Sequence, residues 1–248
     1  MITNIDGIEW RRVKWKGFAK WFLHYSERVA VRFSDVIIAD NQGIADYVSE
    51  AYGVSSTVIA YGGDQSVAPN ATPVTDLGLP KDYAFSVCRI EPENNVDMIV
   101  DAFSRQDKLA LVLVGNWEGS DYGRTIRSRY FGINLFLLDP IYDLGKLKSL
   151  RAEASVYVHG HSAGGTNPSL VEAMHFGIPI LAFDCVFNRF TTANKALYFS
   201  NSEQLLEACS NISAERAGEL GRCMKELANK NYRWNEIAKR YFELVGPS

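Results

Sequence analysis

The 248-residue sequence lacks several features that would tie it to a particular partner or compartment. Its four cysteines are scattered without a C-x-x-C pair, and no signal peptide is present, so we expect reduced cysteines in a cytoplasmic protein. The formal net charge of −3 provides no polyanion-binding field, so nucleic acid is not an expected partner. No apolar run approaches the ~20 residues of a membrane span, and the longest, residues 109–114, has the length of a strand.

Motifs of several enzyme classes are also absent. The sequence contains no serine or cysteine nucleophile motif, no internal repeat and no low-complexity segment. His159 and His161 are two residues apart without further ligands nearby, which is a poor metal site, so we expect no metal. A composition with 47% hydrophobic and 12% aromatic residues nevertheless predicts a well-packed core in one or two domains.

The first 60 residues alternate between strand and helix patterns, which indicates a parallel sheet. The expected strands are residues 2–5, 36–39 and 57–60, and the expected helices are residues 10–33 and 42–51. Three strands are too few for a Rossmann-like sheet, and the first begins abruptly at Met1, so we expect strands to be missing upstream.

The first predicted helix begins with basic residues followed by aromatic ones, and this pattern allows two interpretations. Its basic residues are Arg11, Arg12, Lys14, Lys16 and Lys20, and its apolar residues at helical spacing are Phe18, Trp21, Phe22, Tyr25, Val29 and Phe33. One interpretation is a solvated basic face beside aromatic side chains that belong to the core. The other is a surface that meets an anionic lipid or a lipid-linked substrate.

Residues 65–80, with three prolines and small polar residues, are expected to form an interdomain linker. After them the alternation resumes and continues almost to the end of the chain. Expected strands are 83–87, 109–114, 135–138, 156–158, 180–183 and 196–199; expected helices are 96–103, 121–130, 143–152, 168–176, 202–209, 214–228 and 234–244. We therefore predict an α/β fold with a remnant domain (1–64), the linker, a complete doubly wound domain (81–231) and a closing helical segment (232–248).

The stretch from residue 159 to residue 184 joins two of these strands through a small-residue loop and a short helix. Asn167 suits an N-cap and Pro168 the first helical position, so free N–H groups and a positive helix end would meet at one point. Glu172 follows one turn later, where a carboxylate could bind ribose hydroxyls. The alternative is an ordinary capped helix in which Ser169 and Glu172 form a capping pair.

Several of these residues resemble motifs of the GT-B glycosyltransferases, specifically the large retaining family of glycosyl transferases group 1. Arg89 ends a strand where the family places its diphosphate clamp, and Asn94 stands where the family usually has lysine. Glu172 matches the second of two glutamates spaced eight residues apart, which implies ribose binding, whereas the first falls on Gly164. The resemblance implies diphosphate contacts from Arg89 and Asn94, and from Gly165, Thr166, Asn167 and Ser169 in the loop.

Two strings, residues 4–10 and the Gly-Gly-Thr-Asn-Pro-Ser run at 164–169, resemble a branch of capsule and cell-wall rhamnosyltransferases. This implies dTDP-rhamnose as donor and no cofactor besides the nucleotide sugar. The resemblance further implies a base-binding set, Gly115, Asn116, Asp139, Ile141 and Tyr142, and a sugar or phosphate contact from His159 and His161. It implies no catalytic residue that we can name. Residues 232–234 resemble the family's closing segment, which implies that the last helix, in 232–248, crosses back to the N-terminal domain.

We therefore expect the donor-binding half of a glycosyltransferase of surface polysaccharide synthesis. Its partners would be a nucleotide sugar and a saccharide or lipid-linked saccharide acceptor, with a second copy or a separate N-terminal-domain protein completing the enzyme. The expected location is the cytoplasm, at the inner membrane face if the basic helix binds lipid. The alternative is a non-catalytic nucleotide-binding subunit or a truncated chain. A third hypothesis for the function is a sugar epimerase with the GT-B fold.

Overall fold

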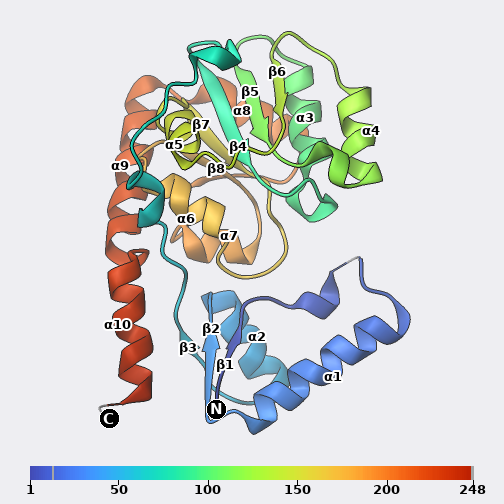
Figure 1. Cartoon of the computed structure of the whole chain (residues 1–248), viewed down its shortest axis with the longest axis vertical. Helices are drawn as coiled ribbons and strands as arrows, with labels where there is room; N and C mark the ends of the chain where they lie inside the picture. Colours follow the sequence, from blue (N-terminus) through green and yellow to red (C-terminus); the bar gives the residue numbers. More distant parts are fainter. Residues whose placement is uncertain (13, 247–248) are drawn as a thin grey trace.

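The computed structural model describes residues 1–12 and 14–246 and contains two parallel sheets (Figure 1). The first sheet has the order β1-β2-β3, formed by β1 (Ile2–Ile5), β2 (Val36–Ala39) and β3 (Thr57–Val58). Helices α1 (Gly17–Phe33) and α2 (Gln42–Tyr52) connect these strands. Asn41 caps α2 by accepting from the Gly43 N–H at 2.9 Å. Residues 247–248 of the predicted closing segment lie outside the described residues.

The second sheet has six strands in the order β6-β5-β4-β7-β8-β9, which is the doubly wound arrangement. Its strands are β4 (Tyr83–Val87), β5 (Ala110–Val114), β6 (Leu135–Leu138), β7 (Val156–His159), β8 (Ile180–Phe183) and β9 (Leu197–Phe199). Its helices are α3 (Val96–Ser104), α4 (Asp121–Arg129), α5 (Leu144–Ala152), α6 (Pro168–Met174), α7 (Val186–Thr191), α8 (Ser202–Asn211) and α9 (Ala214–Asn231). All pairs are parallel, so the carboxyl ends of the strands meet along one edge.

Helices cover both faces of this sheet because successive side chains of a strand point to opposite sides. Tyr83 and Phe85 of β4 enter one core cluster with α6 and α9, whereas Ala84 enters the other with α3 and α8. The central strands are therefore apolar on both faces, and the helices on either side hold them in the sheet. The edge formed by their carboxyl ends faces the first sheet (Figure 1).

The last helix, α10 (Trp234–Val245), crosses back to the first sheet (Figure 1). Ile237 is buried in a cluster with Ile38 of β2 and with Ile59, the residue after β3. Residues 64–80 are held against α5: the Ser149 hydroxyl donates to the Thr72 carbonyl at 2.7 Å, and Lys146 pairs with Asp76 at 2.7 Å. These contacts fasten the predicted linker along the second sheet's helices.

The structure departs from the sequence predictions at the first helix. Helix α1 begins at Gly17, whose φ of 52° favours glycine, and residues 9–11 form a separate 3-10 turn. Glu9 stabilises this entry by accepting from Trp15 Nε1 at 2.8 Å and pairing with Lys14 at 3.1 Å. Helix α7, which fills the loop after β8, was not predicted. The described helices include none long and apolar enough to cross a bilayer.

The interpretation of the α1 aromatic residues as core side chains is wrong. Phe18, Trp21, Phe22, Tyr25 and Phe33 are all exposed, and Val31 is the buried residue of the helix. Helical spacing shows that these aromatic side chains share one face, but that face points away from the sheet.

Candidate functional site

Two adjoining cavities lie at the carboxyl ends of β4, β5 and β7, where ligands bind in open α/β sheets. The first, about 360 Å³, is lined by residues that include Arg89, Asn94, Arg151, His161, Asn167, Ser169 and Glu172. The second, about 400 Å³, is lined by residues that include Arg89, Gly115, Asn116, Ile141 and Tyr142. Val87, Cys88 and Arg89 border both cavities. Most of the predicted diphosphate, ribose and base residues are thus brought into one continuous site.

Arg89 follows β4 and occupies the boundary between the two cavities. Its guanidinium is largely exposed and lies 3.6 Å from a Glu91 carboxylate oxygen, so it is available to an anionic ligand. Asn94 is buried and its amide is already engaged: Nδ2 donates to the Arg89 carbonyl at 2.7 Å, and Oδ1 lies 2.8 Å from His161 Nδ1. Asn94 therefore supports the backbone of Arg89 and orients His161.

The two histidines have different positions. His159 is buried in β7 and its Nε2 has no hydrogen-bond partner among the described residues, whereas His161 lines the first cavity. Burial, with Arg12 and Arg89 nearby, lowers the pKa of His161 to about 4. Burial likewise lowers the pKa of His159, so both rings are neutral near pH 7. Since Nδ1 of this neutral ring donates to Asn94 Oδ1, Nε2 of His161 can accept a hydrogen bond from a ligand hydroxyl, but the ring supplies no positive charge.

The loop before α6 and the first turn of α6 use some of their N–H groups within the protein. The Thr166 N–H donates to Asp40 Oδ2 at 2.9 Å, and the Ser169 N–H donates to Asn167 Oδ1 at 3.0 Å. Gly165 and Thr166 consequently lie at the junction with the first sheet, and neither lines the two cavities. The loop offers fewer free N–H groups than the sequence predicts. Side chains therefore supply more of the groups that could contact a ligand.

Glu172 is held from two sides. Arg151 of α5 donates to Oε2 at 2.5 Å, and Gln65 donates to Oε1 at 2.9 Å. Arg151 is buried, and its Nε has no partner among the described residues. Sequence reasoning missed this cation, whose only signal was a basic residue next to Leu150 on a helix with a buried face. The carboxylate that was predicted to bind ribose is therefore oriented by a buried guanidinium.

Asp40 is a second residue that sequence reasoning missed. It follows β2, is almost completely buried, and its Oδ1 has no hydrogen-bond partner among the described residues. A Cβ at Gly165 would lie 1.7 Å from Asp40 Oδ1, so the carboxyl group occupies the space that the glycine leaves. Burial, reinforced by the negative charge of Asp6, raises the pKa of Asp40 to about 8. The first sheet thus places a protonated acid directly under the loop.

The second cavity contains four of the five predicted base-binding residues. Gly115 follows β5, where a Cβ would lie 2.4 Å from Ile90 Cδ1, so only glycine fits. Tyr142 is exposed at the rim, which leaves its ring free to stack on a base. Asp139 lies elsewhere: its carboxylate pairs with Arg127 at 2.7 Å on the surface. Within the described residues no three His, Cys, Asp or Glu side chains gather as metal ligands.

Comparison with known proteins agrees with this arrangement. The family model described as Glycosyl transferases group 1 matches residues 71–220, and the model described as Domain of unknown function (DUF1972) matches residues 1–64. No curated protein matches the chain.

Three solved structures are similar over nearly the whole chain. Sucrose-phosphate synthase from Thermosynechococcus elongatus has a TM-score of 0.79 at 18% identity and covers 98% of this chain. TarM has a TM-score of 0.75 at 13% identity and covers 99%. HepE from Anabaena, solved in complex with UDP-glucose, has a TM-score of 0.80 at 16% identity and covers 98%. The chain spans 66%, 50% and 71% of these three proteins, and the likeness establishes a GT-B fold.

Proposed function

The chain belongs to the family of glycosyl transferases group 1, and we propose that it is the donor-binding half of a glycosyltransferase of surface polysaccharide synthesis. In this proposal residues 81–231 bind the nucleotide sugar and residues 1–64 belong to the acceptor side. The proposed donor is dTDP-rhamnose and the proposed acceptor is a saccharide, free or linked to lipid. The observation that carries the proposal is the pair of adjoining cavities that share Arg89.

The shape and chemistry of the two cavities suit a nucleoside diphosphate. The cavity with Gly115 and Tyr142 offers an apolar slot and an exposed ring for a base. The cavity with Asn167 and Glu172 offers the Asn167 side-chain N–H groups for the diphosphate and the Glu172 carboxylate for the ribose, whereas the Ser169 hydroxyl donates to Asn167 Oδ1 at 2.8 Å. Arg89 lies between them, where a planar guanidinium can bind two phosphate oxygens at once. Bound UDP-glucose in the similar HepE structure supports a nucleotide sugar as the ligand class.

The chemistry expected of these residues is stabilisation of the leaving group. As the bond between sugar and diphosphate breaks, negative charge grows on the diphosphate, and Arg89 and the start of α6 lower the energy of that charge. Glu172 holds the ribose so that the diphosphate stays against Arg89. The sugar itself would lie toward Gly164 and the first sheet, where His161 Nε2 can accept a hydrogen bond from a sugar hydroxyl.

Calorimetric titration of the folded chain with dTDP, UDP and GDP tests the proposal. We expect binding of a nucleoside diphosphate, with dTDP preferred. A folded sample that binds none of the three would rule out the donor-binding assignment.

Arg89→Ala tests the phosphate contact directly. We expect nucleotide affinity to fall by about 1.5–3 kcal/mol because charge-assisted hydrogen bonds are lost. Arg216→Ala is the matched control, since Arg216 is an exposed arginine on α9 that pairs with Glu219. Unchanged affinity in Arg89→Ala would remove this residue from the site.

A second candidate function is a nucleotide-binding subunit that is completed by another protein. The observation that favours it is the outer edge of β1, which pairs with no other strand among the described residues. Sugar transfer that appears only after an N-terminal-domain protein is added would support this function. Transfer by the chain alone would support a self-sufficient enzyme.

A further inference from the structure

Helix α1 presents an uncovered aromatic face. The exposed fractions are 75% for Phe18, 58% for Trp21, 52% for Phe22, 53% for Tyr25, 37% for Val29 and 66% for Phe33. Trp21 stacks on Tyr25 with ring centroids 5.5 Å apart, and Phe18 lies 5.6 Å from Trp21. These rings contact one another along the helix and form a continuous apolar stripe. A stripe with tryptophan and tyrosine is typical of helices that lie at a membrane interface.

The same segment carries most of the positive charge of the first sixty residues. Residues 11–33 contain seven lysines and arginines and a single acid, Glu27, a formal charge of +6 in a chain whose net charge is −3. Glu27 is turned inward, where it accepts from the hydroxyls of Tyr47 and Tyr52, each at 2.5 Å. Arg12 and Lys14 pair with Glu9, so the other five basic residues of the segment supply the positive charge that complements an anionic surface.

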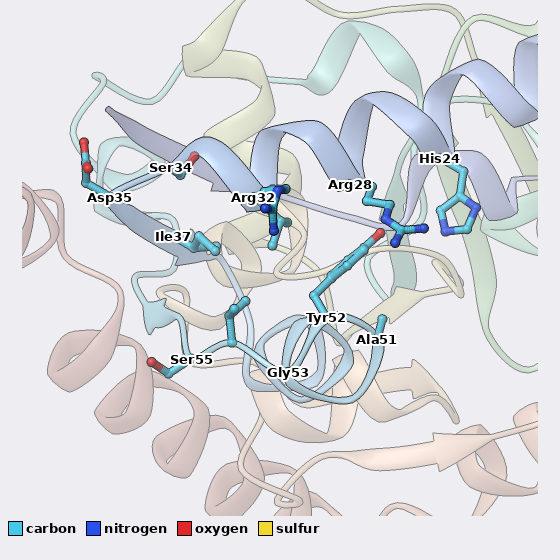
Figure 2. A pocket seen from close by; sticks show the side chains of 12 residues that line it. His24, Arg28, Arg32, Ser34, Asp35, Ile37, Ala51, Tyr52, Gly53 and Ser55 are labelled. Carbon is cyan, nitrogen blue, oxygen red and sulfur yellow. The ribbon is translucent and has the colours of Figure 1, made fainter.

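A cavity of about 860 Å³ opens next to this stripe, between α1 and the end of α2 (Figure 2). His24, Arg28 and Arg32, each one turn further along α1, line it from above, and Figure 2 shows Arg28 and His24 extending toward Tyr52. Among the described residues, no salt bridge involves Arg28 or Arg32. The acid on the cavity wall, Asp35, accepts from the Met1 amino group. The two guanidinium groups are thus available to a phosphate.

We propose that α1 is an in-plane membrane anchor, with its aromatic stripe in the interface of an anionic bilayer and Arg28 and Arg32 binding lipid phosphate at the mouth of this cavity. The aromatic stripe supplies apolar burial and the basic residues supply attraction, the two contributions that interfacial helices need. This contact would hold the first sheet at the bilayer. It does not depend on the donor chemistry, because the nucleotide cavities lie at the other end of the first sheet's strands.

Flotation of the full 248-residue chain with lipid vesicles tests the proposal. We expect binding to phosphatidylcholine vesicles that contain phosphatidylglycerol, weaker binding to phosphatidylcholine alone, and loss of binding at high salt. Trp21→Ser/Phe22→Ser should abolish binding. Arg28→Gln/Arg32→Gln should lower the partition coefficient about 25-fold, since each basic residue near an anionic bilayer contributes about fivefold.

Two control variants match these changes. Phe131→Ser/Ile133→Ser removes two apolar side chains after α4 that are even more exposed, at 79% and 96%. Arg222→Gln/Lys230→Gln removes two exposed charges from α9. Both should bind vesicles like the unchanged chain, and all variants should keep nucleotide affinity and circular dichroism. No binding to anionic vesicles would overturn the proposal, as would equal losses in test and control variants. Self-association abolished by Trp21→Ser/Phe22→Ser, without vesicle binding, would instead make α1 a protein interface.

Discussion

Asp40 shows how one residue links the two sheets. Its Oδ2 accepts from the Thr166 N–H at 2.9 Å, and its carbonyl accepts from the Thr166 hydroxyl at 2.6 Å. The neighbouring Asn41 donates to the Phe187 carbonyl at 3.2 Å and to the Thr191 hydroxyl at 3.1 Å. An ionised carboxylate would be costly here, because the group is almost completely buried and Oδ1 has no hydrogen-bond partner among the described residues. The residue is therefore best accommodated with a proton on Oδ1.

Asp40→Asn should change the pH dependence of stability. The pKa of Asp40 is raised to about 8 in the folded protein, against about 4 in an unfolded chain. Between these values the folded protein keeps a proton that the unfolded chain releases, so the contribution of Asp40 to the free energy of unfolding falls as pH rises. The loss is at most about 1.4 kcal/mol per pH unit, and it stops above about pH 8. Asparagine cannot ionise and should remove this slope.

Urea denaturation of both proteins from pH 5 to pH 9 measures the effect. The difference between Asp40→Asn and the unchanged chain should grow in favour of asparagine up to about pH 8 and then level off. The exposed Asp107→Asn controls for the removal of a surface carboxylate. A difference that does not vary with pH would contradict the raised pKa.

At the scale of elements, α6 is the part on which the proposed donor site depends. Asn167 caps the start of α6 locally. The orientation of α6 comes from Glu172, whose carboxylate joins α6 to α5 through Arg151 and to residues 64–67 through Gln65. Gln65 in turn accepts from Trp234 Nε1 at 2.6 Å at the start of α10. Three separate parts of the chain therefore determine where the carboxylate of Glu172 lies.

Arg151 and Glu172 should be energetically coupled. Arg151→Met leaves a partly buried carboxylate without its cation, and we expect a loss of about 2–4 kcal/mol in the free energy of unfolding. Glu172→Gln leaves the guanidinium unpaired and should also destabilise. The double variant should cost less than the two losses combined, with a coupling of about 1–3 kcal/mol in urea denaturation. Additive losses would mean that the 2.5 Å contact contributes nothing.

At the scale of the whole molecule, α10 connects the second sheet to the first. It leaves the second sheet at Trp234, whose N–H donates to Asp64 at 2.8 Å, and it packs on the first sheet through Ile237. Gly62 permits this path, because a Cβ there would lie 2.6 Å from the Trp234 ring. The first sheet has few strands and a small core, so this helix covers apolar surface that the three strands would otherwise expose.

Ile237→Ala should loosen the first sheet selectively. Truncating this buried side chain should cost about 2–4 kcal/mol, and amide exchange should accelerate at residues 36–39 and 57–60 while the second sheet keeps its protection. Phe242→Ala on the same helix is the matched control, since Phe242 is 76% exposed and its loss should cost less than about 0.5 kcal/mol. Equal exchange rates in the two variants would contradict the role of α10.

The sequence by itself determined the features that depend on near neighbours. Strand patterns and caps predict the strands of both sheets and the start of α6 at Pro168, because alternation, N-caps and proline act within a few residues. Since parallel strands end along one edge, the same patterns bring Arg89, Gly115 and His161 to one region.

Only the tertiary structure decided which distant groups meet. The contact of Asp40 with Thr166 spans 126 positions, and the pairing of Arg151 with Glu172 joins two helices; no local pattern encodes either. The aromatic stripe of α1 is another feature that the sequence pattern alone does not determine. Periodicity reveals which side chains share a helix face, but whether that face is covered depends on what packs against it, and among the described residues this face stays exposed.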